Sequence, residues 1–311
     1  MALFAPTRFQ RSAWHTWRAL STLRVAGVPE HFNAPFHLAK ERGLYEAKGV
    51  DMQWNMTPQG TGAMGQKLDS DEVDVAVMLS EGAVARIVDG SKTKVIGTYV
   101  KSPLRWGIHV KRGSPIKKPS ELKGKIFGVS RMLSGSHLMA HVFAHQQGWS
   151  PATDAPLRIV GTLDGAREAM GKDEIDAWLW EKFTTKHLVD SGEWDIIGEV
   201  PTPWPCFLFV ASDRAIATKQ AEIRHLVEVT KELCDEFKEN AGNKTVDYVA
   251  KNHALSTADA REWLGGTEWA CGLSVEKRTF DSTQEALLTI GQIKQAMGHE
   301  QLHSSELCSV I

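Results

Sequence analysis

The sequence predicts an α/β protein of two lobes, each built on a mostly parallel sheet flanked by helices, with a ligand cleft between the lobes. The segment DEVDVAV at 71–77 has a counterpart, DEIDAWL, at 173–179. Strands and helices alternate along both halves of the chain, which is the pattern of a parallel sheet covered by helices. The chain also crosses between the halves twice, near 101–112 and 199–212, and paired crossings can act as a hinge.

The first lobe is expected to alternate strand and helix from residue 23 onward. Gly43 stands where the first helix should end, because glycine readily takes the left-handed conformation that follows many helices. The glycine-rich turn 58–62 opens the second helix. We expect strand 23–28, helix 34–43, strand 50–55, helix 61–69, strand 73–78, helix 81–89 and strand 94–100.

The second lobe repeats this alternation after the loop 112–115. We expect strand 125–129, helix 134–147, strand 157–160, helix 163–171, strand 175–179, helix 182–190 and strand 194–198. The run FLFVA at 207–211 predicts a strand that returns to the first lobe, and the sequence beyond it reads as helical to about residue 297. The predicted domains are an N-terminal extension at 1–22, a discontinuous first lobe at 23–104 and 206–300, a second lobe at 105–205, and a C-terminal tail at 301–311.

Composition excludes two classes of partner. The net charge of −2 over 311 residues gives no electrostatic case for nucleic acid binding. No window approaches the run of about 18 apolar residues that a membrane span needs, so we expect a soluble protein. The cysteines have neither zinc-site nor disulfide-framework spacing, which favours a reducing compartment. They are Cys206, Cys234, Cys271 and Cys308.

The N-terminal segment has the composition of a mitochondrial presequence. Residues 1–24 carry four arginines and no acidic residue. We therefore expect import into the mitochondrial matrix; the alternative is a cytoplasmic protein whose N-terminus carries no targeting signal. At the other end, Cys308 begins a loose match to a prenylation motif, but Ser309 is not aliphatic and no polybasic run precedes it. We expect an unmodified, disordered tail.

Several short motifs, in a fixed order, resemble one protein family. They are NAPFHLAKERGLY at 33–45, GVD at 49–51, VDVA at 73–76, GSPI at 113–116, ELKGK at 121–125 and DAWLWE at 176–181. This order resembles the type 2 periplasmic-binding-protein fold. More narrowly, it is similar to the branch that holds sulfonate-, nitrate- and taurine-binding proteins of ABC transporters and the thiamine-pyrimidine synthesis proteins. The resemblance implies a small organic ligand between the lobes.

The chain departs from that family in two ways. It shows neither a secretory signal nor a lipoprotein cysteine, so we expect an intracellular member, for example a fungal or other eukaryotic one, and no transporter partner. It also lacks the cysteine-rich iron-binding cluster of the thiamine-pyrimidine synthases, since no two cysteines lie within twenty residues of each other. Their suicide chemistry is therefore not expected here.

Turns that precede helices are expected to form the ligand site. Their free N–H groups and helix dipoles suit an anionic group such as carboxylate, sulfonate or phosphate, and parallel sheets bind ligands at the carboxyl ends of their strands. Arg131 can pair with an anion through two parallel hydrogen bonds. The alternative is that the hydroxyls only cap helices. The candidates are Gly60, Thr61, Ser80, Glu81, Ser130, Arg131, Ser134 and Ser136.

Four more candidates follow other strands. Asn33 lies after the first strand and can equally be a helix N-cap. Trp180 and Glu181 end the strand of the second repeat, where an aromatic face and a carboxylate suit an apolar or cationic part of a ligand. Trp204 lies between two prolines on the returning segment. Each tryptophan can instead belong to the core.

No motif indicates catalysis or metal binding. His137, His141 and His145 share a helix face but span about 12 Å, too far for one ion, and the known hydrolase, zinc-protease and phosphate-loop motifs are absent. We expect no catalytic residue, metal or cofactor. The main hypothesis is a non-enzymatic protein that closes over a small anionic molecule. The alternatives are an enzyme of pyrimidine or related biosynthesis, with a histidine or Glu181 as acid or base, and an interaction protein that has lost its ligand.

Overall fold

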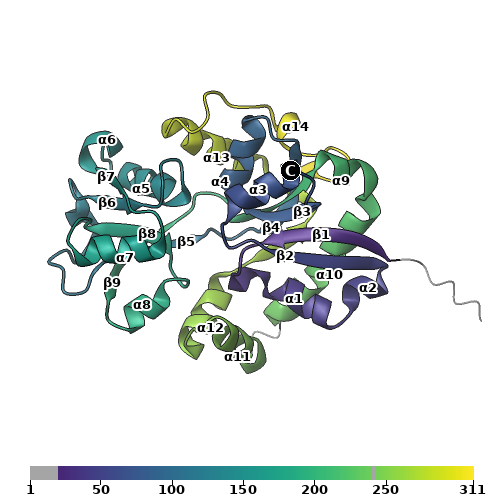
Figure 1. Cartoon of the computed structure of the whole chain (residues 1–311), viewed down its shortest axis with the longest axis horizontal. Helices are drawn as coiled ribbons and strands as arrows, with labels where there is room; N and C mark the ends of the chain where they lie inside the picture. The colour runs from purple at the N-terminus through teal and green to yellow at the C-terminus, as the bar shows by residue number, and fades with distance from the viewer. Residues whose placement is uncertain (1–19, 240–241) are drawn as a thin grey trace, which may run out of the picture.

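The structure is a computed structural model that describes residues 20–239 and 242–311, and these form two lobes side by side (Figure 1). Each lobe contains one large sheet with helices on both faces, so the predicted two-lobed α/β fold is confirmed. The predicted presequence falls almost entirely on residues 1–19, which lie outside the described residues. No described helix combines the length and the hydrophobicity needed to span a bilayer.

The first lobe is built on a six-stranded mixed sheet within the described chain, in the order β11-β4-β10-β3-β1-β2. β1 pairs in parallel with β2 and β3, whereas β10 runs antiparallel between β3 and β4. The bounds are β1 Ser21–Gly27, β2 Val50–Met56, β3 Val75–Leu79, β4 Thr93–Val100, β10 Phe207–Ser212 and β11 Trp269–Gly272. Apart from β11, these strands lie within two residues of the predicted positions.

Helices cover both faces of this sheet and enclose two cores. One core contains Phe36 of α1, Tyr45 of α2 and Leu226 of α10; the other contains Leu68 of α3 and Val84 of α4. Both cores are continuous with the apolar side chains of the strands, and burial of this kind contributes about 25 cal/mol per Å². The bounds are α1 Ala34–Glu41, α2 Leu44–Ala47, α3 Thr61–Asp69, α4 Ser80–Val88, α9 Asp213–Thr218, α10 Gln220–Glu239 and α13 Lys277–Thr289.

The second lobe holds a five-stranded sheet within the described residues, in the order β7-β6-β8-β5-β9. β6 pairs in parallel with β7 and β8, and β5 runs antiparallel between β8 and β9. The strands are β5 Arg105–Lys111, β6 Phe127–Val129, β7 Leu157–Ile159, β8 Ala177–Glu181 and β9 Trp194–Pro201; the helices are α5 Gly135–Gln146, α6 Pro151–Asp154, α7 Leu163–Gly171 and α8 Lys186–Asp190.

Two hydrogen-bonded crossing segments, 101–104 and 202–206, join the lobes as predicted. The backbone N–H of Thr202 donates to the carbonyl of Leu104 at 3.0 Å, and the N–H of Cys206 donates to the carbonyl of Ser102 at 3.1 Å. A pair of adjacent segments limits the lobes mainly to opening and closing about one axis. The cleft side chains near 204–206 therefore lie beside the hinge.

The sequence repeat corresponds to one repeated structural unit. Asp71 and Asp173 both have φ of 58°, so each acidic turn passes through the same left-handed conformation. Asp74 accepts the backbone N–H of Arg24 at 2.9 Å, and Asp176 accepts that of Ile126 at 2.8 Å. In each lobe, this carboxylate links the start of the repeated strand to a backbone N–H that lies 50 residues earlier in the chain.

Three stretches differ from their predictions. The predicted helix 182–190 is shortened to α8, because the carboxylate of Glu181 accepts hydrogen bonds from Thr184 and holds 182–185 in a turn. The region expected to be helical to about residue 297 contains β11 and the short strand β12 Ser274–Val275. The expected disordered tail is ordered instead, since β13 Ser309–Val310 pairs with β12, and Cys308 is buried.

Two of the later helices, α11 Asn243–Asn252 and α12 Thr257–Gly266, form a hairpin that appears between α8 and α1 in the lower part of the view (Figure 1). Trp263 of α12 packs against His31 of the first lobe, with ring centroids 4.4 Å apart. The same His31 ring lies 6.2 Å from Phe183 of the second lobe. The hairpin thus lies where the two lobes meet. A short helix, α14 His299–Leu302, precedes β13.

Candidate functional site

Three helices from the two lobes begin at the same place. A Cβ placed on Gly82 of α4 would collide with the side chain of Thr61, so α3 and α4 begin side by side. A Cβ placed on Gly135 would lie 3.9 Å from a carboxylate oxygen of Glu81, so α5 of the second lobe begins against α4. The free N–H groups of three helix N-termini therefore converge and create a positive potential.

Arg131 extends from the second lobe toward this convergence. Its Nη2 lies 3.9 Å from the position that a Cβ on Gly62 would occupy, in the first turn of α3. Its side chain is exposed and makes no hydrogen bond or ion pair within the described residues. Gly60, the N-cap of α3, has φ of 79°, which glycine adopts without strain. The structure thus brings Gly60, Thr61 and Arg131 together.

The serines before α5 use their hydroxyls within their own turn. Ser134 caps α5 by accepting the N–H of His137, and Ser136 accepts the N–H of Ser130 at 2.9 Å. The hydroxyls of Ser134 and Ser136 lie 3.0 Å apart. Ser134 is thus a helix cap, while Ser130 and Ser136 bond to each other within the turn that carries Arg131. Because Ser134 takes the N–H of His137, the N–H groups left at the start of α5 are those of Gly135 and Ser136.

Ser80 and Glu81 fasten the start of α4 to the second crossing segment. The Ser80 hydroxyl donates to the carbonyl of Pro205, and its N–H donates to that of Cys206 at 3.1 Å. The indole N–H of Trp204 donates to Oε2 of Glu81 at 3.0 Å. Glu81 is only 6% exposed, and burial raises its pKa to about 7, although the Trp204 hydrogen bond acts in the opposite direction.

The loop after β1 places polar atoms without partners beside the second lobe. Asn33 donates its amide N–H to the carbonyl of Val28 at 2.8 Å, but its Oδ1 is buried and unpaired. Nε2 of His31 is also buried without a partner, and burial lowers the His31 pKa to about 3. Burial raises the pKa of Glu30 to about 8, and the nearby Glu181 raises it further. Each group could bond to a ligand.

The sheet of the second lobe adds an aromatic and acidic surface. Trp106 of β5 lies directly opposite Glu181 of β8, so the two side chains share a face of the sheet. The Trp106 ring lies against the start of α5, and its indole N–H is buried without a partner. Trp180 points to the other face and stacks on Trp178 with centroids 5.2 Å apart. It still meets Trp106 edge to face at 6.2 Å.

The thiol of Cys206 lies at the hinge and is fully buried. Burial raises the pKa of Cys206 well above its usual value, and Glu30, Glu81 and Glu181 raise it further. Burial also raises the pKa of Glu181, against the hydrogen bonds from Thr184. A protonated thiol is a poor nucleophile, so this cysteine is unsuited to covalent chemistry. The region where the lobes meet thus has a cationic end at Arg131 and an acidic end near Cys206.

Ion pairs connect the second lobe to α12. Lys182 lies 2.7 Å from Glu199 and 2.6 Å from Glu262, and Arg105 lies 2.7 Å from each of the same two carboxylates. Glu199 belongs to the second lobe and Glu262 to α12. These ion pairs favour the lobe arrangement seen here.

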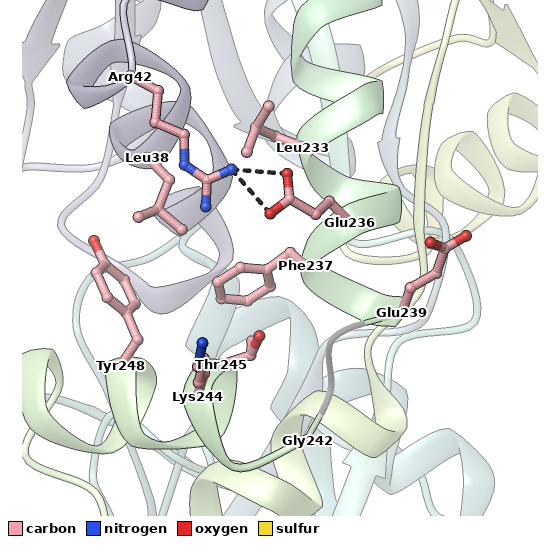
Figure 2. Close-up of a pocket in the computed structure, with 10 residues that line it drawn as sticks. All are labelled: Leu38, Arg42, Leu233, Glu236, Phe237, Glu239, Gly242, Lys244, Thr245 and Tyr248. Atoms are coloured by element: carbon pink, nitrogen blue, oxygen red, sulfur yellow. Dashed lines mark hydrogen bonds and ion pairs between the residues drawn. The ribbon is translucent and has the colours of Figure 1, made fainter.

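Figure 2 shows a separate pocket of about 630 Å³ between α1, α10 and α11. Its main cation, Arg42, is already held by both carboxylate oxygens of Glu236, at 2.7 and 2.9 Å. Phe237 and Tyr248 form an aromatic wall. The pocket contains none of the predicted site residues.

The described residues contain no group of three or more side chains able to hold a metal ion. His137 and His141 pack edge to face with centroids 4.7 Å apart, while His145 is exposed. Burial lowers the pKa of His141 to about 4, and the neighbouring His137 lowers it further. His141 is therefore neutral near pH 7.

Comparisons with known proteins agree with this architecture. Residues 106–200 match the family model described as Ca3427-like PBP. A similar solved structure is that of the Candida albicans CA3427 gene product, which is described as having the generic periplasmic binding protein fold. Its sequence is 28% identical to this chain, and the two structures superpose with a TM-score of 0.77. The alignment covers 91% of this chain and 94% of that one. No curated protein matches the sequence. The chain has the type 2 periplasmic-binding-protein fold.

Sulfonate-binding relatives share the fold at lower identity. The aliphatic sulphonate binding protein SsuA from Escherichia coli is 18% identical with a TM-score of 0.75, and the alignment covers 91% of this chain and 92% of that one. SsuA from Xanthomonas axonopodis pv. citri, solved bound to MOPS, is 16% identical with a TM-score of 0.71 and coverages of 90% and 96%. The narrower predicted likeness to sulfonate-binding proteins is therefore confirmed at the level of the fold.

Several cleft residues of this periplasmic-binding-protein-like chain were not predicted. Trp106, Phe183 and Cys206 come together near the lobe boundary only through contacts between strands or lobes that are distant in sequence. Glu30 and His31 belong to a loop whose position could be predicted, because it follows the first parallel strand. Their missing hydrogen-bond partners required the structure.

Proposed function

We propose that this protein binds a small organic acid between its lobes, with the anionic group at the N-termini of α3 and α5 under Arg131. The ligand residues are those that the sequence predicts, with the serines acting mainly through the backbone turn that they fix. Asn33, Trp180, Glu181 and Trp204 belong to the remaining walls. The protein releases its ligand unchanged when the lobes reopen.

One observation carries this proposal: Arg131 has no partner within the described chain, yet lies over the start of a helix from the opposite lobe. An arginine and helix N-termini together favour carboxylate, sulfonate or phosphate groups. An anion placed there would contact both lobes, so its binding would favour the closed arrangement. The likeness to proteins that bind sulfonates supports the same class of ligand.

The test is a thermal-shift screen of small carboxylates, sulfonates and phosphates, followed by calorimetry on any hit. Arg131→Ala should weaken binding roughly tenfold to a hundredfold, because a charge-assisted hydrogen bond contributes about 1.5–3 kcal/mol. The matched control is Arg158→Ala, since Arg158 is a partly exposed arginine of the same lobe that pairs with Glu174. Equal affinity in both variants would show that the anion binds elsewhere.

The alternative is an enzyme, related to pyrimidine biosynthesis, that uses the same cleft. Its support is Glu81, whose pKa of about 7 suits proton transfer near neutral pH. A hit that the protein converts to product, with turnover lost in Glu81→Gln, would establish the enzyme. Recovery of every hit unchanged would leave the binding protein. Location in the mitochondrial matrix, without a transporter partner, is a further proposal that follows from the N-terminal composition.

A further inference from the structure

We propose that Cys234 and Cys271 form a reversible disulfide when the protein meets hydrogen peroxide, and that this bond fixes the base of the hairpin formed by α11 and α12. In the sequence, the two cysteines lie on either side of a stretch that contains both helices of this hairpin. In the fold, they belong to two elements that pack together, α10 and β11. The inference is independent of the ligand, because neither cysteine belongs to the proposed anion site.

The two thiols are in direct contact inside the first lobe. Their Sγ atoms lie 2.8 Å apart, and each residue is 1% exposed. The contact extends to neighbouring rings, since Phe237, one turn further along α10, meets Trp269 of β11 edge to face with centroids 5.7 Å apart. Helix and strand thus face each other at both levels. A bond between the sulfur atoms requires only a small side-chain rotation, because a disulfide joins its sulfur atoms at about 2.05 Å.

The backbone of β11 directs the Cys271 side chain toward α10. Cys271 has φ of 41°, a conformation that is uncommon for residues other than glycine. The pairing of β11 with β4 also shifts register between Trp269 and Gly272, and such a bulge redirects the side chains that it carries. The irregular strand therefore brings the Cys271 thiol to Cys234.

The other two cysteines provide the comparison. Cys206 and Cys308 are buried, and neither makes a sulfur–sulfur contact within the described residues. The Cys308 thiol instead contacts the carbonyl oxygen of Ser309 at 3.6 Å. The fold thus selects one pair of thiols for a bond, although the spacing of the cysteines along the chain does not indicate it.

The oxidation couples two thiols to one molecule of peroxide, which is small enough to reach buried sulfur. Burial raises the pKa of Cys234 well above its usual value, whereas the charge of Lys231, one turn earlier on α10, acts in the opposite direction. A scarce thiolate makes the reaction slow. The first step falls to Cys234: its thiolate attacks one peroxide oxygen and becomes a sulfenic acid, while the departing hydroxide takes up the thiol proton as water.

The second step forms the bond. The Cys271 sulfur attacks the Cys234 sulfur, and the sulfenic hydroxyl group leaves with the Cys271 proton as a second water. The two thiols lose two electrons in total, and the peroxide gains them. A dithiol such as dithiothreitol returns the electrons and restores both thiols.

The bond would join the two ends of the segment that carries the hairpin. Lys238 of α10 already holds the end of this segment by donating to the carbonyl of Thr267 at 2.8 Å. The indole N–H of Trp269 donates to the carbonyl of Phe32 at 3.2 Å, in the loop that also carries His31. A covalent link beside these contacts should restrict the motion of the hairpin, and α12 pairs with the second lobe through Glu262.

The first experiment maps the bond in the full chain. The protein is reduced, freed of reductant and treated with millimolar hydrogen peroxide at pH 7.5, after which free thiols are blocked during unfolding and the chain is digested with trypsin. Peptides 232–238 and 262–277 should be recovered as a linked pair that dithiothreitol separates. Cys308→Ser is the matched control and should retain the linked pair, whereas Cys234→Ser and Cys271→Ser should each lose it.

The second experiment measures the effect of the bond. A cross-link that closes a loop of about 40 residues should raise the melting temperature of the oxidised wild type by about 5 °C. Cys271→Ser, given the same peroxide treatment, should show no such rise. Amide hydrogen exchange in residues 243–266 should slow roughly threefold or more on oxidation of the wild type, because the hairpin opens less often.

Several results would overturn the inference. Cys234 and Cys271 that stay free after hours in peroxide, or that carry oxygen as sulfinic acids, would show that the bond does not form. A link from either cysteine to Cys206 or Cys308 would show that the pairing is wrong. A linked pair with unchanged melting temperature and unchanged hairpin exchange would refute its role at the base of the hairpin. None of these results bears on the anion site, which the ligand screen tests separately.

Discussion

The buried carboxyl of Glu81 gives a direct test of the electrostatics of the cleft. Its side chain is 6% exposed, and burial raises its pKa from the ordinary 4.5 to about 7. Between these two pH values the unfolded chain releases the proton while the folded protein retains it. The folded state therefore loses stability as pH rises from 4.5 to about 7, and little changes above that. The loss is about 3 kcal/mol, since each pKa unit is worth about 1.4 kcal/mol.

Glu81→Gln should remove this loss while keeping an acceptor for the indole N–H of Trp204. The variant should match the wild type near pH 4.5 and exceed its stability by about 3 kcal/mol at pH 8, or about 5 °C in melting temperature. Urea unfolding of both proteins at pH 4.5, 6, 7 and 8 measures the difference. All other titrating groups cancel in this comparison. A stability difference that does not change with pH would refute a raised pKa at Glu81.

Two other predictions concern the repeat and the ion pairs. Asp74→Ala should cost about 3–5 kcal/mol in urea unfolding, because it removes the buried carboxylate that pairs with Arg24, Arg214 and Lys219. Asp176→Ala, at the same repeat position with a backbone partner at 2.8 Å, should cost about 1–2 kcal/mol. Equal losses would contradict the role of the cations. Glu262→Gln should change the free energy of unfolding by less than about 1 kcal/mol, because the Glu262 side chain is 46% exposed. It should nevertheless speed backbone hydrogen exchange in residues 182–185. Unchanged exchange there would show that the α12 contact does not hold the lobes together.

Local sequence signals predicted the elements that are stabilised by local interactions. Helices 61–69 and 163–171 have the predicted bounds, since a glycine or threonine N-cap and an acidic turn at the C-terminal end mark each one. The turns before α3 and α4 lie side by side because the carboxyl ends of the parallel strands that precede them meet at one edge of the first sheet. The two lobes and their crossings followed from the repeat and the alternation of elements.

Long-range contacts decided what the sequence could not show. β11 and β13 are short strands that exist because β4 and β12 pair with them, and their own residues show no alternating pattern. The turn at 182–185 depends on one carboxylate, Glu181, accepting the hydrogen bonds of Thr184. The acidic end of the cleft was predicted only in part, because Glu30 and Glu181 become neighbours only when the lobes come together.

The most direct measurement is a crystal structure of the protein with 2-bromoethanesulfonate, in which anomalous scattering locates the bromine. The account predicts sulfonate density between Arg131 and the first turns of α3 and α5, with the bromine inside the interlobe cleft. Bromine in the pocket between α1, α10 and α11 (Figure 2), with an empty interlobe cleft, would contradict it.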